Sequence, residues 1–246
     1  MQKISEVIHE SWHKHLQPLF DDPKMGLIKD KLLPHCKFYP APENIFRVFE
    51  MPLQDIKVVI LGQDPYPNGE AIGYAFAVNE RKTGTIPASL QVISAELQRS
   101  SNHLESKLKT STLSHWIQQG VFLLNTALTV EVGEPGKHIG QWLWFTREVI
   151  GVISREVKPV WLLWGAKAQG FLDYINLPYN GIRPQSEIDG GYEMQSDLLR
   201  EQNVYFKAYH PAAEKYSGGK NTFMNCNHFN LCNEILERQN KSIINW

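Results

Sequence analysis

Short apolar runs alternate with segments of helical spacing along this chain, and this alternation limits the folds that it can adopt. Four runs have the character of buried strands, at residues 58–61, 121–124, 160–163 and 204–208. Helical crossovers between successive strands favour parallel pairing with right-handed connections. We therefore predict an α/β fold in which a single domain, covering residues 1–246, is built on a central four-stranded, mainly parallel sheet flanked by helices.

Residue spacing and capping patterns predict where the helices lie. An amphipathic helix is expected near the N-terminus, where Ile4, Val7, Ile8, Leu16 and Leu19 fall near helical spacing. A second helix is expected to begin with Ser89 as its N-cap, and a third to end shortly before Gly120. Further helices are expected around residues 149–153 and over about residues 227–238.

Composition places the chain among ordinary globular proteins. It has 246 residues, of which 42% are hydrophobic, and no apolar run of 18 residues. Its N-terminal segment is polar and does not resemble a signal peptide. Cys36, Cys226 and Cys232 form no C-x-x-C pair, which favours a reducing compartment and argues against a disulfide framework, a zinc site or an iron–sulfur cluster. We expect a cytoplasmic protein that needs no cofactor or metal and acts away from membranes.

Three of the predicted strands are each followed by a polar side chain that can take part in chemistry. Asp64 follows the first strand, Asn125 the second and His210 the fourth. Ligands of open α/β sheets bind just beyond the carboxyl ends of the strands. Parallel pairing would therefore bring these three side chains together at one edge of the sheet and make that edge the predicted site.

The formal net charge of −1 is low for a protein that binds nucleic acid, because such domains are usually basic. Net charge says little about one face of a molecule, however. Arg81, Lys82, Lys215 and Lys220 lie in segments that would flank the predicted site. We expect a small positive patch there, with modest and salt-sensitive affinity for phosphates.

The segment Gly62-Gln63-Asp64-Pro65-Tyr66 resembles the water-activating motif of the family 1 uracil-DNA glycosylases. Further motifs similar to those of the family follow the same order along the chain, from about residue 38 to the end. They lie at residues 43–49 (expected to be a helix), 73–76, 87–90, 120–126, 163–165, 210–211, 226–229 and 243–246. The resemblance implies a monofunctional glycosylase of base excision repair, a hydrolase that releases free uracil from DNA and leaves an abasic site.

Breaking an N-glycosidic bond develops positive charge on the sugar and negative charge on the leaving base, as in glycoside hydrolysis. Asp64 would stabilise the sugar cation and position the attacking water. By the family resemblance, His210 would act as a neutral donor to O2 of the leaving base, a preorganised electrostatic stabiliser. His138 aligns with a family histidine near Asp64 and is a supporting candidate.

Recognition of the base would fall to four further residues. Asn125 carries an amide donor and acceptor that suit the N3–H and O4 of uracil, whereas cytosine presents the opposite pattern. Phe76 would stack on the uracil ring. By resemblance, Tyr66 blocks the space beside C5, where a thymine methyl group would clash, and Gln63 contacts uracil through its backbone.

The chain departs from the family in the segments that would grip DNA. Pro67 stands where the family usually has a histidine, and the segment before Ser89 is shortened to Pro87 and its neighbours. By ungapped counting, Glu214 takes the place of the family's intercalating leucine, and Tyr216 or Phe223 could substitute as the wedge. The predicted DNA-binding residues are Pro87, Ser89, Ala212, Glu214, Lys215 and Tyr216.

A carboxylate is a poor wedge, because it loses solvation among bases. We therefore expect a weakened grip on duplexes and a preference for uracil that is single-stranded or mispaired. Two alternatives stay open: a catalytically weak DNA-binding or partner-recruiting module on the same fold, and a glycosylase with shifted base specificity. The expected partner is uracil-containing DNA, bound by a monomer, and a protein inhibitor is kept among the partners considered.

Overall fold

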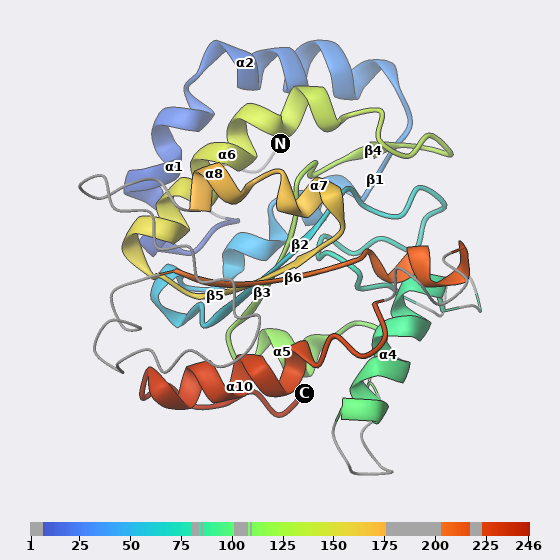
Figure 1. Ribbon diagram of the computed structural model, residues 1–246. Helices are drawn as coiled ribbons and strands as arrows, with labels where there is room; N and C mark the ends of the chain where they lie inside the picture. Colours follow the sequence, from blue (N-terminus) through green and yellow to red (C-terminus); the bar gives the residue numbers. More distant parts are fainter. Residues whose placement is uncertain are drawn as a thin grey trace.

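The four predicted strands form one parallel sheet (Figure 1). The computed structural model describes residues 7–79, 84, 86–100, 108, 110–175, 203–216 and 223–246. The spatial order is β3-β2-β5-β6, and every neighbouring pair runs parallel. The strands are β2 (Val58–Gly62), β3 (Val121–Asn125), β5 (Val160–Trp164) and β6 (Val204–Ala208). The predicted α/β architecture is confirmed.

The strands are apolar on both faces because each face packs against its own layer of helices. Val59, Leu61 and Phe122 point into one hydrophobic core, whereas Val58 and Ile60 point into the other. In Figure 1 the first face is covered by α1 (His13–Phe20) and α6 (Ile139–Glu156), and the second by α5 (Ser114–Ile117) and α10 (His228–Arg238). Further helices in the described residues are α2 (Pro23–Gly26), α4 (Ala88–Ser100), α7 (Ala166–Gln169) and α8 (Leu172–Ile175).

Short helical turns also occur in the described part of the chain. One of them, η3 (Leu27–Leu32), is a π-helix. The others are 3₁₀ turns, namely η2 (Glu10–Trp12), η4 (Leu33–His35), η5 (Pro42–Asn44), η6 (Arg47–Glu50), η7 (Leu53–Asp55) and η8 (Pro211–Tyr216). None of the helices in the described ranges has both the length and the apolar character needed to cross a membrane.

Most of the predicted helices are confirmed, with corrections at two places. The helix at 43–49 is wrong: the segment forms the separate turns η5 and η6, closed by i→i+3 bonds such as that from the Phe49 N–H to the Phe46 carbonyl. Ser89 is not an N-cap, because α4 already includes Ala88, and the Gln91 N–H bonds to the carbonyl of Pro87 at 3.1 Å. The N-terminal helix is present in part as α1, which includes Leu16 and Leu19, whereas Val7 and Ile8 precede it in a turn and Ile4 lies outside the described residues.

A second, antiparallel sheet joins β1 (Phe38–Tyr39) to β4 (Val130–Glu131), and the sequence did not predict it. Two-residue strands are too short to show a period of two, so pattern reasoning cannot detect them. This ribbon matters for the site because β4 leads directly into residues 132–138, the segment that returns to the carboxyl end of β2 and opens α6.

Candidate active site

A pocket of about 240 Å³ opens beyond the carboxyl ends of β2, β3 and β6, where the sequence placed the site. All six residues predicted to bind uracil or catalyse its release line this pocket, and Ser89 joins them. Its lining is Gly62, Gln63, Asp64, Pro65, Tyr66, Pro67, Tyr74, Phe76, Ser89, Asn125, Pro135 and His210. Such a volume is smaller than the roughly 300–1,000 Å³ of sites for drug-sized ligands and suits one small planar ring.

Sheet register and a glycine set the position of Asn125. Gly62 on β2 pairs directly with Asn125 on β3, each the last residue of its strand. A Cβ atom at Gly62 would collide with the Oδ1 atom of Asn125 and would come within 2.8 Å of the Ala75 Cβ. Only glycine therefore leaves room for the amide to lie at this edge of the sheet.

The carboxylate of Asp64 is oriented through both of its oxygens. Gln63 donates from Nε2 to Oδ1 at 3.1 Å, and the backbone N–H of Gly136 donates to Oδ2. Gly136 has a φ of +83°, a left-handed conformation that glycine adopts readily. Hydrogen bonds to both oxygens hold the carboxylate in one orientation toward the pocket.

His210 is held as a neutral imidazole with its proton on Nε2. The Ala212 N–H donates to Nδ1 at 3.1 Å, which requires a lone pair on that nitrogen. Burial also lowers the pKa of His210 below its usual value, which favours the uncharged form. The histidine packs closely on Gly165, where an added Cβ would come within 2.8 Å of the His210 Cβ. Its Nε2–H is therefore available as a donor.

Phe76 provides an aromatic wall beside His210. The two ring centroids lie 6.0 Å apart, and the centroid of the Trp164 ring lies 5.6 Å from that of Phe76. The φ of Phe76 is +63°, which is rare for a bulky residue and costs about 1–2 kcal/mol. Backbone strain of this kind is often found at functional sites, and here it accompanies the placement of the ring in the pocket wall.

Tyr66 is fixed by a short hydrogen bond to Ser89, with 2.6 Å between the two hydroxyl oxygens. Burial raises the pKa of Tyr66 to about 12, so the phenol stays protonated. Ser89 was predicted to contact DNA, but it is only 7% exposed and its hydroxyl is engaged inside the protein. Its side chain positions the tyrosine that would exclude a 5-methyl group.

Asn125 is 6% exposed, yet its side chain makes no hydrogen bond to any residue that the structure describes. The neighbouring residue, Thr126, is bonded instead to the backbone of Gln63, from its hydroxyl at 2.7 Å. A buried amide without a protein partner is costly unless a ligand or water pairs with it. Both ends of the Asn125 amide are thus left for a guest in the pocket.

The segment after His210 is organised differently from a projecting wedge. The Glu214 carboxylate accepts hydrogen bonds from the N–H groups of Phe223 at 2.6 Å and Met224 at 3.2 Å, so it ties η8 to the start of the next segment. Phe223 is wrong as a candidate wedge: it is fully buried, with its ring 4.9 Å from that of Trp164.

The other predicted DNA contacts are only partly described. Pro87 is half-buried at the start of α4, and Ala212 contributes through its backbone N–H to His210. The backbone of Lys215 and Tyr216 belongs to η8, but the structure does not describe their side chains. Arg81, Lys82 and Lys220 lie outside the described residues altogether.

Sequence reasoning missed several residues of the site, among them Tyr74, Pro135 and Gly136. Pro135 lines the pocket and Gly136 bonds to Asp64, and the only sequence signal for them was a Pro-Gly turn pattern. His138 does not line the pocket. It is fully buried, with Nδ1 3.0 Å from the Thr129 hydroxyl and Nε2 3.8 Å from the Cys36 sulfur.

The chain matches known proteins over most of its length. A family model described as the Uracil DNA glycosylase superfamily matches residues 49–237. A uracil-DNA glycosylase of Borrelia duttonii is 38% identical over 218 residues, covering 85% of this chain and 82% of that protein. A uracil-DNA glycosylase of equine herpesvirus 2 is 32% identical over 252 residues, covering 97% of this chain and 88% of that protein.

Solved structures give the same relationship. The crystal structure of mimivirus uracil-DNA glycosylase superposes with a TM-score of 0.77 at 25% identity, covering 99% of this chain and 89% of that one. A variant of the mimivirus protein, solved in complex with UGI, gives a TM-score of 0.80 at 24% identity, covering 99% and 90% of the two chains.

Proposed function

The chain belongs to the uracil-DNA glycosylase superfamily, and we propose that the pocket lined by Asp64, Asn125 and His210 is the place where it excises uracil. The reaction is hydrolysis of the N-glycosidic bond in DNA, which releases free uracil for base excision repair. The observation that carries the assignment is the convergence in one small pocket of an oriented carboxylate, an unpaired amide and a neutral histidine.

Uracil enters this pocket only after it has left the base stack. Phe76 offers its ring face, and Asn125 offers an acceptor for N3–H and a donor for O4. Cytosine has an unprotonated N3 in place of N3–H and an amine in place of O4, so the Asn125 amide would face the wrong partners. Tyr66, locked by Ser89, occupies the space beside C5 and excludes the methyl group of thymine.

The two catalytic residues act on opposite charges of the transition state. Asp64 stabilises the positive charge that develops on the sugar and takes a proton from the water that attacks C1′. As the C1′–N1 bond breaks, its electron pair passes to the base, and the Nε2–H of His210 donates to the O2 atom that gains negative charge. Because His210 is already neutral and oriented, its Nε2–H can stabilise the leaving base through a hydrogen bond without transferring a proton to it.

We further propose that single-stranded or mispaired uracil is the favoured substrate. Glu214 is held by the backbone of residues 223 and 224, and the described side chains of Ala212 and Ala213 are too small to fill a vacated base site. Opening a paired base then receives little help from the side chains that the structure describes in this segment, while a single strand avoids that cost of a few kcal/mol. A protein inhibitor is also proposed as a partner, supported by the mimivirus variant in complex with UGI. A cytoplasmic location and a monomeric state stay predictions.

The experiment compares oligonucleotides that carry a single uracil, thymine, cytosine or hypoxanthine, and follows the release of the free base. We expect release of uracil alone, and a rate on single strands at least about tenfold higher than on a U:A duplex. Asn125→Asp should lose most uracil release and gain activity on cytosine, because the new carboxylate accepts from the cytosine amine.

Equal release from single strands and from the U:A duplex would contradict the substrate preference, and release of hypoxanthine or thymine would contradict the assigned base specificity. Binding of uracil-containing DNA without release of any base would mean that the protein is a DNA-binding module and not a glycosylase.

A further inference from the structure

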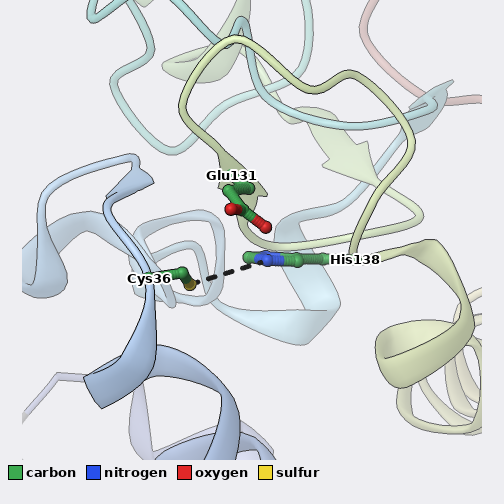
Figure 2. A group of neighbouring side chains, drawn as sticks. All are labelled: Cys36, Glu131 and His138. Atoms are coloured by element: carbon green, nitrogen blue, oxygen red, sulfur yellow. Dashed lines mark hydrogen bonds between the residues drawn. The ribbon is translucent and has the colours of Figure 1, made fainter.

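Three side chains with metal-binding atoms meet beneath the segment that opens α6. Cys36 comes from the approach to β1, Glu131 ends β4, and His138 precedes α6. Figure 2 shows the Cys36 sulfur beyond the nitrogen end of the His138 ring and the Glu131 carboxylate above the ring. One ligand atom from each of the three residues lies within 4.8 Å of the other two.

The separation of the Cys36 sulfur from His138 Nε2 fits a tetrahedral metal site. Zinc binds a thiolate at about 2.3 Å and an imidazole nitrogen at about 2.0–2.1 Å, so tetrahedral geometry places the two ligand atoms about 3.6 Å apart. The observed separation between the Cys36 sulfur and His138 Nε2 is 3.8 Å. An ion between them needs only a small adjustment of either side chain.

The surroundings of His138 also suit a metal ligand. Imidazoles that bind metals usually donate their other N–H to a fixed acceptor. The Thr129 hydroxyl lies 3.0 Å from Nδ1 and accepts a bond of 2.7 Å from Trp142 Nε1. A hydroxyl oxygen has two lone pairs, so it can accept from Trp142 and His138 together and leave Nε2 for the metal.

Charge and access favour a cation at the same place. The Glu131 carboxylate makes no hydrogen bond or ion pair with any residue in the described ranges, and it faces the cluster. The nearby Lys137 ammonium is held by Glu134 at 2.7 Å. Cys36 and Glu131 are half-buried, so the cluster has a side open to solvent.

We propose that Cys36, Glu131 and His138 bind one divalent metal ion of borderline softness, with Zn²⁺ as the best fit and a water as fourth ligand. A thiolate, an imidazole and a carboxylate form a donor set suited to that ion. Binding replaces the thiol proton, which leaves for solvent, so affinity rises with pH. Sequence spacing gave no sign of this site because Cys36 lies far along the chain from Glu131 and His138.

The ion would act on the active site through residues 132–138. Glu131 and His138 stand at the two ends of this segment, and Gly136, between them, donates its N–H to Asp64. A metal bound at both ends would hold the segment in the arrangement that orients the carboxylate. The proposal concerns positioning, and the glycosylase chemistry described above takes place without the ion.

The test titrates metal-free, reduced, full-length protein with Co²⁺, which reports thiolate ligation through a charge-transfer band in the near ultraviolet. We expect the band to saturate at one ion per chain and to vanish in Cys36→Ser. Glu131→Gln should weaken binding at least about tenfold. Zn²⁺ at a hundredfold excess over its Kd should displace Co²⁺ and raise the Tm by roughly 5–10 °C.

Cys226→Ser is the matched control, because Cys226 is also half-buried and lies beside Glu96, away from the cluster. It should keep the band and the Tm shift in full. A band of equal strength in Cys36→Ser, or no thiolate band in the wild-type protein, would overturn the proposal. Circular dichroism of each variant verifies that loss of binding is not loss of the fold. None of these readouts depends on glycosylase activity.

Discussion

Gly62 and Gly165 hold open the space in which Asn125 and His210 stand. An added Cβ at either position would meet the functional side chain itself. Glycine at both sites is thus required by close packing, and at Gly165 also by a φ of +91°. The Asn125 amide and the His210 imidazole can occupy their positions because the neighbouring glycines lack a Cβ atom.

Gly62→Ala should lower kcat/KM for uracil release at least tenfold, because the new methyl group displaces the Asn125 amide. Steady-state kinetics on a single-stranded substrate measures the effect. The control is Gly140→Ala, since a Cβ at this α6 position meets nothing within 4 Å. A wild-type rate in Gly62→Ala would mean that the amide of Asn125 does not have to lie where the structure places it.

His210 gives a prediction about pH. Burial lowers its pKa, so the neutral form persists as pH falls through the ordinary histidine value of about 6.5. Protonation would also replace the Nδ1 lone pair that accepts from Ala212. We expect kcat/KM to stay level from pH 8 to about 6.5 and to fall only at lower pH. A loss of activity centred above pH 6.5 would contradict a neutral, buried donor.

Individual side chains of the site were predictable where a motif carried them, as for Asp64, Tyr66 and Asn125. Gly136 was not, because it acts through a backbone N–H, and every non-proline residue has one. The pairing of Tyr66 with Ser89 was hidden for a different reason. A serine near the start of a helix usually caps it, and here the tertiary contact takes the hydroxyl instead.

At the scale of elements, a buried carboxylate joins two helices. Glu96 on α4 accepts from the N–H groups of Asn225 and Asn227, just before α10, and from Arg99 on its own helix. Burial alone would raise the pKa of Glu96, but the hydrogen bonds from Arg99, Asn225 and Asn227 lower it overall. The carboxylate thus anchors the residues that lead into α10, whose N-cap residue Asn227 makes no side-chain cap bond.

Glu96→Gln should destabilise the protein by about 1–3 kcal/mol. The glutamine amide has only one acceptor oxygen, so it cannot accept from Arg99, Asn225 and Asn227 as the carboxylate does. Urea denaturation measures the free energy of unfolding. Glu148→Gln, on the exposed side of α6, is the control and should change stability by less than about 0.5 kcal/mol. Equal stability of wild-type protein and Glu96→Gln would show that the start of α10 does not depend on this carboxylate.

The main sheet was predictable because its parallel strands bury both faces and leave continuous apolar runs in the sequence. The β1–β4 ribbon lacks such a pattern. Its partners lie about ninety residues apart in sequence, so no local signal joins them. For that reason, neither the loop that reaches Asp64 nor the cluster of Cys36, Glu131 and His138 could be foreseen.

For the whole molecule, acid stability depends partly on a histidine in the core. His228 accepts from Trp164 Nε1 at 3.0 Å, and burial lowers its pKa to about 4. In the unfolded chain it titrates near 6.5, so between pH 6.5 and 4 the unfolded state binds more protons and stability falls as pH falls.

The loss attributable to His228 should be about 2 kcal/mol between pH 7 and pH 5. His228→Asn keeps an acceptor for Trp164 but cannot take up a proton in this range. Its free energy of unfolding should therefore fall less over the same interval, which urea denaturation at the two pH values would detect. The same pH dependence in both proteins would contradict a neutral His228 in the folded state.

In the proposed mechanism, hydrolysis of the N-glycosidic bond depends on the carboxylate of Asp64. The deciding measurement is cleavage of a single-stranded oligonucleotide with one uracil, treated with alkali after incubation with the wild-type protein, Asp64→Asn or Asp173→Asn. Asp173 is exposed on α8 and serves as the matched control. We predict alkali-labile cleavage by the wild-type protein and Asp173→Asn, with a rate at least about a hundredfold lower in Asp64→Asn. A wild-type rate in Asp64→Asn would contradict the proposed mechanism. Failure of the wild-type protein to cleave either single strands or duplexes would contradict it as well.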